Sequence, residues 1–401
     1  MPQFLSKFVP RSAIVVLLML TAGAVLAFAA VSHLVTRYNE NQKARGRRLY
    51  AQGMAELNSG NTNAAIQALR AALICDRTNS QYQLSLGRAL RDDGRLDEAQ
   101  SYLLSLWEKT PEDGTINLAL ARVAARRGSI DDAVRYYHNA MYGIWPSDSD
   151  VNRRNARFEL VEFLLQKNAL AQARAELLSL AAFLPPDPAL RLRTANLLFQ
   201  AQDYSDALAE YERVLKLDRG NLAALAGAGK AAYQAGRYRT ADRYLQSAVA
   251  ANPHDVSLRT LKDSADLILQ SDPFVRRISD AERNRRIEAA FTQAGERLRA
   301  CAQQKGVDLS QVKPASSSLS PSPPPISQLS AGSSLESLES RLLAAKPELR
   351  RLRFSDQTDL PDVIMDLVFD IEQQTAAICG EPQGVDEALL VLSRDRENAD
   401  Q

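Results

Sequence analysis

The stretch that decides the fold is residues 80–113, SQYQLSLGRALRDDGRLDEAQSYLLSLWEKTPED. Apolar residues recur at helical spacing in its first half, at Tyr82, Leu86 and Leu90. They recur again in its second half, from Leu96 onward, after a turn sequence that contains Gly94. This pattern predicts two amphipathic helices joined by a tight turn.

Small residues recur along the chain with a stride of 34. One ladder consists of Ala65, Ala99 and Ala133, followed after a single gap of 40 by Ala173, Ala207 and Ala241. A second ladder runs twelve residues upstream, at Gly53, Gly87, Ala121, Val161, Ala195 and Gly229. Small residues let paired helices approach closely, and phased ladders over such a length predict an array of stacked helical hairpins.

These units resemble the tetratricopeptide repeat, a helix–turn–helix unit of 34 residues. Six units fit, at 46–79, 80–113, 114–147, 154–187, 188–221 and 222–255. The resemblance implies an all-α, right-handed helical-hairpin solenoid over about half of the chain. It also implies a scaffold that binds other proteins and is not an enzyme.

An apolar segment at residues 12–36 precedes the array, behind a short tail, 1–11, that carries Lys7 and Arg11. Its apolar part, about 20 residues, is long enough to cross a bilayer as one helix. We therefore predict a single-pass signal anchor. The alternative is a cleaved export signal, with Ala27-Phe28-Ala29 as the cleavage site.

The orientation of this anchor stays open. The basic residues that follow it are Arg37, Lys43, Arg45, Arg47 and Arg48. By the positive-inside rule they place the array in the cytoplasm. A short basic tail directly before an apolar run is instead typical of an export signal, and on that ground we favour an extracytoplasmic, periplasmic array.

Further elements follow the array. Residues 256–305 predict capping and extension helices, because the last repeat needs a cover for its apolar face. Residues 306–333 are rich in Ser and Pro and predict a disordered linker. Residues 334–395 predict a small helical module, with a break at Pro347. Cys301 and Cys379 flank the linker, and two readings stay open for them: two separate buried thiols, or a disulfide, which requires an oxidising compartment.

Composition and motifs point away from catalysis. The 401 residues carry a net charge of +1, so the chain has no general attraction for nucleic acid. Three His and three Cys are few for a catalytic or metal-binding protein. Lys230 lacks the Ser or Thr of a phosphate loop, and the acidic stretch 148–159 lacks the Gly of a calcium loop. We expect no cofactor, no metal, no catalytic residue and no small-molecule substrate.

The resemblance also implies a partner-binding groove lined by the first helices of the units. The residues at its positions are Tyr50, Met54, Leu84, Arg88, Arg91, Arg122, Arg126, Phe158, Asn196, Phe199, Lys230 and Tyr233. The four arginines fall on two adjacent units, and guanidinium groups suit carboxylates, which favours an acidic or C-terminal peptide segment. A solvated basic face is the alternative.

We therefore expect a membrane-anchored scaffold or adaptor that mediates protein–protein interactions at the cell envelope. The alternative is a structural envelope protein that self-assembles through its C-terminal helices. A third reading is an enzyme with an unrecognised active site in the C-terminal region.

Overall fold

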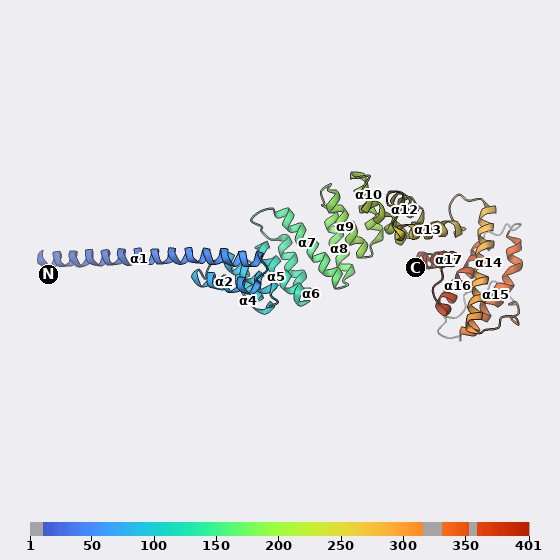
Figure 1. The fold of residues 1–401 in the computed structure, drawn as a ribbon, viewed down its shortest axis with the longest axis horizontal. Coiled ribbons are helices and arrows are strands. Elements are labelled where there is room, and N and C mark those ends of the chain that lie inside the picture. The colour runs from blue at the N-terminus through green and yellow to red at the C-terminus, as the bar shows by residue number, and fades with distance from the viewer. Residues whose placement is uncertain (1–10, 316–330, 353–358, 401) are drawn as a thin grey trace, which may run out of the picture. The chain divides into compact units, whose positions relative to one another are not determined.

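In a computed structural model, residues 11–315, 331–352 and 359–400 are described, and they are almost entirely helical (Figure 1). No strand forms in these ranges, although one isolated bridge joins Asp113 and Ile144. The expected all-α class is confirmed. The chain divides into two compact units, residues 1–176 and 177–401, and each is described by itself.

The first unit consists of helical hairpins. Its helices are α1 (Arg11–Asn58), α2 (Thr62–Cys75), α3 (Ser80–Asp92), α4 (Leu96–Trp107), α5 (Gly114–Arg127), α6 (Ile130–Tyr142) and α7 (Ser149–Gln166), and α8 (Leu170–Ala182) begins in it. Neighbours in the chain pack against each other in pairs, α1 with α2, α3 with α4 and α5 with α6. α3 also contacts α5, so the first helices of successive hairpins lie next to one another.

α1 joins the apolar segment to the array without a break (Figure 1). This helix of 48 residues contains both the apolar run and the first helix of the first repeat. Its large apolar side chains between Val16 and Val35 are exposed. By length and composition the helix is a candidate membrane span.

Each hairpin of the best-fitting repeats closes over a glycine. A Cβ added to Gly53 would lie 2.9 Å from Leu69 Cγ, and one added to Gly87 would lie 2.9 Å from Leu103 Cγ. The leucine in each case is on the second helix, sixteen residues further along the chain. The glycine therefore fixes how closely the two helices cross.

The start of α7 shows what the gap of 40 contains. α7 begins at Ser149, five residues before the predicted fourth unit, so most of the additional residues lengthen this helix. Trp145, just before it, donates from Nε1 to the carbonyl oxygen of Ala140 at 2.9 Å and lies against Gly114. The insertion is thus a longer helix held by a packed tryptophan.

The second unit continues the hairpins and ends in four further helices. Its hairpin and cap helices are α9 (Pro188–Gln200), α10 (Tyr204–Leu217), α11 (Leu222–Gln234), α12 (Tyr238–Ala251) and α13 (Val256–Ser271). The remaining helices are α14 (Asp280–Lys305), α15 (Ala331–Arg351), α16 (Leu360–Cys379) and α17 (Val385–Asp400). α14 shares one apolar core with α15, α16 and α17, so it belongs to the C-terminal module rather than to the array.

Two predictions for this region are wrong. Residues 306–315 of the predicted disordered linker are placed: Val307 and Leu309 pack against the module core, and Ser340 Oγ donates to the carbonyl oxygen of Lys313 at 2.7 Å. Most of the predicted linker, residues 316–330, lies outside the described residues. The predicted break at Pro347 is also wrong, because α15 continues through it. A proline removes one helical hydrogen bond, and packing of the apolar face of α15 on the module core compensates for that loss.

The C-terminal module contacts the end of the array within this unit. The hydroxyl of Tyr238 on α12 donates to Asp395 Oδ2 on α17. The guanidinium of Arg396 lies 5.2 Å from the ring centroid of Phe274, which follows α13. α17 also packs along α13, the helix predicted to cap the array.

Replacing a ladder glycine should loosen its hairpin. In Gly229→Ala the new Cβ would lie 2.7 Å from Leu245 Cδ2, so we expect unfolding of the detergent-solubilised chain in urea to become easier by about 1–3 kcal/mol. The control is Gly220→Ala in the same unit, where the nearest atom is 3.8 Å away and the change should stay within about 0.5 kcal/mol. Equal unfolding curves for the two variants would contradict the close-crossing account.

Candidate functional site

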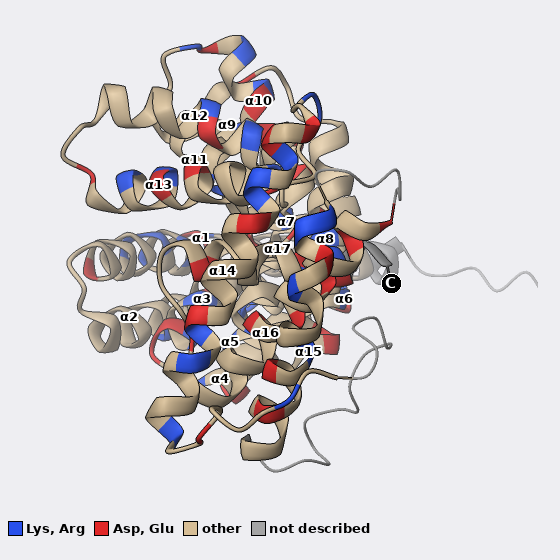
Figure 2. Cartoon of the chain, turned by 90° about the vertical axis from the view of Figure 1, so that its right-hand side faces the viewer, with Lys and Arg blue, Asp and Glu red and all other residues tan. Residues whose placement is uncertain are grey.

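Arginine side chains of α3 and α5, at predicted groove positions, lie together in the first unit. Arg88 lies close enough to Arg91 and Arg122 for their positive charges to lower its pKa. Arg126 Nη1 donates to the carbonyl oxygen of Arg91 at 2.5 Å. The structure therefore brings the four predicted arginines into one cluster. Figure 2 shows both basic and acidic residues on the helices of the chain, so the partners of each arginine decide what it can bind.

Arg122 is already bound to a carboxylate of its own chain. Its Nε and Nη2 donate to Glu159 Oε2 and Oε1 at 2.8 and 2.6 Å, a bidentate pair that raises the pKa of Arg122. Glu159 lies on α7, the first helix of the next hairpin, and the sequence reasoning did not assign it to the groove. Its position 37 residues after Arg122, close to one repeat stride, is the signal that could have indicated the pair.

Arg91 and Arg126 share one acidic neighbour. Arg91 Nη2 lies 2.8 Å and Arg126 Nη2 3.7 Å from Asp92 Oδ1. Asp92 therefore supplies one negative charge to two cations. Arg91 Nη1 is buried and has no acceptor in the described part of the chain.

Arg88 differs from the other three arginines. Among the described residues it forms no ion pair, and its Nε is buried without an acceptor. Burial lowers the pKa of Arg88, and the charges of Arg122 and Arg91 lower it further, whereas Tyr50 and Asp113 raise it to a lesser extent. A partly buried cation without a counter-charge favours an anion beside it.

An aromatic pair lies on the α1 side of Arg88. The rings of Tyr50 and Tyr82 stack with their centroids 4.8 Å apart, and the Tyr50 hydroxyl is hydrogen-bonded to Ser85 Oγ at 3.1 Å. Met54 and Leu84, two further predicted groove residues, are half-buried. The arrangement offers guanidinium donors next to an apolar and aromatic surface.

The assignment of Phe158 to the groove is wrong. Its side chain on α7 is fully buried, because removing a large apolar ring from water is worth more than exposing it to a groove. The side chain that reaches the neighbouring hairpin at this point is that of Glu159.

The predicted groove residues of the second unit differ in how far their side chains already contact other residues of the chain. Asn196 Oδ1 accepts from the Tyr211 hydroxyl at 2.7 Å, and Phe199 makes an edge contact with Tyr204 at 5.3 Å. Tyr233 makes an edge contact with Tyr238, and its pKa is raised by burial and by Glu387 and Asp395 of α17. Lys230 is half-buried and forms no ion pair with any residue that the structure describes. The C-terminal helix thus lies near this end of the predicted groove.

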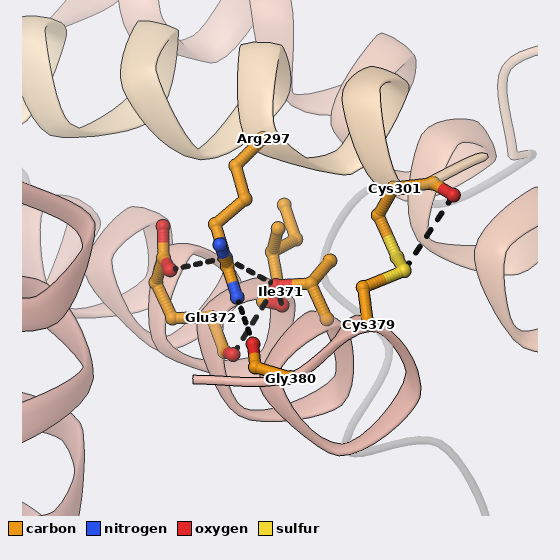
Figure 3. Close-up of a disulfide and its surroundings, with 7 residues drawn as sticks. Arg297, Cys301, Ile371, Glu372, Cys379 and Gly380 are labelled. Carbon is orange, nitrogen blue, oxygen red and sulfur yellow. Dashed lines mark hydrogen bonds and ion pairs between the residues drawn. A yellow bond between two sulfur atoms is a disulfide. The ribbon is translucent and has the colours of Figure 1, made fainter. Parts of the chain in front are cut away.

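A charged cluster is buried in the C-terminal module (Figure 3). Arg297 Nε lies 3.1 Å from Glu372 Oε2, but it donates its hydrogen bond to Thr375 Oγ1 at 2.9 Å. Arg297 Nη2 donates to the carbonyl oxygen of Gly380, also at 2.9 Å. Neither carboxylate oxygen of Glu372 accepts a hydrogen bond from a described residue. Burial, and then the charge of Asp386, raise the pKa of Glu372 to about 8.

Cys301 and Cys379 lie beside this cluster. The two residues are joined as a disulfide between α14 and the end of α16, with their Cα atoms 5.8 Å apart (Figure 3). Arg297 and Cys301 are on the same helix, and the Gly380 carbonyl that holds Arg297 directly follows Cys379. The remaining cysteine, Cys75, is free and half-buried. No group of three or more His, Cys, Asp or Glu side chains is arranged to hold a metal ion within the described ranges.

Comparisons with known proteins identify the family. Tetratricopeptide repeat models match residues 50–106 and 84–149, and another matches residues 198–264. The chain contains tetratricopeptide repeats, a class of fold that serves as a scaffold for protein–protein interaction. No curated protein matches the sequence.

Several solved structures are similar to part of the chain. PilF of Pseudomonas aeruginosa has 17% identity and a TM-score of 0.37, over 55% of this chain and 98% of that one. PilW, a type IV pilus biogenesis factor, has 17% identity and a TM-score of 0.38, over 54% and 97%. YrrB, with an unusual peptide-binding site, has 15% identity and a TM-score of 0.37, over 49% and 98%. At these identities and TM-scores, none of the similarities indicates a partner for this chain.

The buried glutamate predicts a pH-dependent module. Because the folded state holds the Glu372 proton more tightly than the unfolded state, unfolding releases a proton between pH 4.5 and about 8. The stability of the module should then fall as pH rises through this window, by about 1.4 kcal/mol per pH unit at most. Glu372→Gln should remove this slope and be the more stable protein at pH 8.

The measurement is unfolding in urea at a series of pH values, monitored by the hydrogen exchange of α16. Glu381→Gln is the control, since Glu381 is exposed and paired with Arg394. That variant should keep the wild-type slope. A slope that survives in Glu372→Gln would show that another group titrates.

Proposed function

We propose that the chain is a membrane-anchored, non-enzymatic adaptor at the cell envelope. Its array binds an acidic or C-terminal segment of a partner protein in the groove of the first unit, with α1 as the anchor. The observation that carries this proposal is Arg88, a partly buried guanidinium with no carboxylate partner in the described residues.

The donors of Arg88 and Arg91 define the chemistry of the bound group. Each arginine leaves one buried nitrogen without an acceptor, Nε on Arg88 and Nη1 on Arg91, and the two residues are one helical turn apart on α3. A carboxylate has two acceptor oxygens in one plane, and guanidinium groups bind such a group with directed, charge-assisted hydrogen bonds. Arg122 and Arg126 add positive potential, although Glu159 already occupies donors of Arg122 and Arg126 Nη1 donates to the carbonyl oxygen of Arg91.

The half-buried ring of Tyr50, which stacks on the buried ring of Tyr82, supports a peptide rather than a free carboxylate. An apolar side chain that flanks the acidic group would contact this aromatic surface and contribute through burial. Preformed helices on both sides lower the entropy that binding costs. The groove therefore suits an extended segment that carries an acidic residue next to an apolar one.

The location we propose is a single-pass membrane protein with an extracytoplasmic array. The candidate span in α1 supports the anchor, and the Cys301–Cys379 disulfide supports an oxidising compartment. Cleavage of α1 as a signal would instead cut a helix that runs without interruption into the first repeat.

The self-assembly alternative uses a surface that the chain already fills. α17 contacts the array end of its own chain through Tyr238 and Asp395. Docking on a second copy would require this internal contact to open, so we favour the adaptor.

Charge reversal at Arg88 tests the groove. We expect Arg88→Glu to weaken capture of the partner from solubilised membranes by about tenfold or more, because a hydrogen bond to a charged group contributes about 1.5–3 kcal/mol. The variant breaks no ion pair of the described chain and should fold normally. Arg135→Glu on α6 is the matched control, since it makes the same charge change at an exposed position and should not reduce capture. Unchanged capture by Arg88→Glu would reject the groove assignment.

The disulfide tests the compartment. Mass spectrometry of non-reduced protein from native membranes should detect a peptide that links Cys301 to Cys379, while Cys75 should react with a thiol reagent after denaturation. Free thiols at all three positions would instead indicate a reducing compartment and a cytoplasmic array.

A further inference from the structure

Basic residues without partners follow the apolar part of α1. They are Arg37, Lys43, Arg45, Arg47 and Arg48, and we call residues 37–48 the basic segment. All five side chains are exposed, and none forms an ion pair with a described residue. Glu40 is the single acidic residue of the segment, which leaves a net charge of +4 there, five positive charges against one negative.

Several arginines elsewhere in the first unit have acidic partners. Arg70 and Arg95 both pair with Glu98, at 2.6 and 2.5 Å, and Arg135 pairs with Asp132 at 2.7 Å. The basic segment differs from these arginines because its five basic side chains have one acidic residue, Glu40, among them and form no ion pair with a described residue. A concentrated, uncompensated positive charge attracts an anionic partner.

The helix fixes where these charges lie relative to a membrane. α1 is continuous, so at about 1.5 Å per residue Lys43 lies roughly 9 Å and Arg48 roughly 17 Å beyond Arg37 along its axis. Arg37 directly follows the apolar run. Tyr38, next to it, is 64% exposed, and an exposed tyrosine at this point is typical of the membrane–water interface.

We propose that the basic segment binds the headgroups of anionic phospholipids, with Arg37 and Lys43 in contact with their phosphates. The headgroup layer on each side of a bilayer is about 5–8 Å thick, so Arg37 lies at its inner boundary and Lys43, with its long side chain, lies at its outer boundary. Arg45, Arg47 and Arg48 lie further out and act through the longer-range field, which extends about 8–10 Å in physiological salt. This inference rests on the proposed membrane anchor.

Binding of headgroups would hold the first repeat close to the membrane surface. The contact between α1 and α2 includes Gly46, which lies within the basic segment, and Gly53, which follows it. A segment bound to the surface therefore keeps the groove that begins at Tyr50 near the bilayer. The groove would then bind its partner segment close to the membrane.

The test uses the full chain in vesicles of phosphatidylcholine with phosphatidylglycerol, each lipid spin-labelled in turn in trace amount. Electron paramagnetic resonance measures the fraction of label immobilised by the protein. At low salt we expect the phosphatidylglycerol probe to be immobilised several-fold more strongly than the phosphatidylcholine probe. In about 1 M salt, where the Debye length is about 3 Å, the difference should largely disappear. Equal immobilisation of both probes at low salt would overturn the inference.

Two variants with equal charge change locate the contact. Arg37→Gln with Lys43→Gln should abolish most of the lipid preference, whereas Arg47→Gln with Arg48→Gln should retain most of it. Equal losses in both variants, or no loss in either, would overturn the assignment to Arg37 and Lys43. Absence of any immobilised lipid would reject the membrane anchor itself, and a preserved anchor with no headgroup preference would reject only this inference. In that second case, loss of a captured acidic protein in Arg37→Gln with Lys43→Gln would identify a protein partner for the segment.

Discussion

The close crossing of paired helices at a small residue is the constraint on which the rest of the structure depends. Gly53, Gly87 and Gly229 each face a leucine sixteen residues further along, and each leaves no room for a Cβ. A hairpin closed in this way presents one apolar face that only the next hairpin can cover. Stacking then places first helices side by side, which is what brings arginines of α3 and α5 together.

Arg88 and Glu372 both lack full charge compensation among the described residues, and they lie in opposite kinds of environment. Arg88 is half-buried in the groove that we propose, where the carboxylate of a bound segment would neutralise it. Glu372 is sealed inside the C-terminal module, so it can be neutralised only by a proton or by Arg297. The first arrangement suits recognition. The second makes the stability of the module depend on pH and places its cluster next to the disulfide between α14 and α16.

More of the fold than of the site could be predicted, because the spacing of the small residues can be read directly from the sequence. The stride of Ala99 and Gly87 is visible in the sequence, and so is the cap at 256–271, which α13 spans. The state of an arginine depends on which carboxylate packing brings to it. Arg122 looked equivalent to Arg88 until α7 placed Glu159 against it. The predictions for Phe158 and Pro347 were wrong for a similar reason. Burial of Phe158 and packing of α15 outweighed what repeat position and proline chemistry predict.

Site-specific photocrosslinking in native membranes tests the central claim most directly. A photoreactive side chain in place of Leu84 lies on the groove side of α3, and one in place of Ser101 lies exposed on α4, away from it. The account predicts that position 84 crosslinks to an acidic segment of a partner protein, that Arg88→Gln reduces this product, and that position 101 does not yield it. The same products from both positions, or a product at position 84 that is insensitive to Arg88→Gln, would contradict the account.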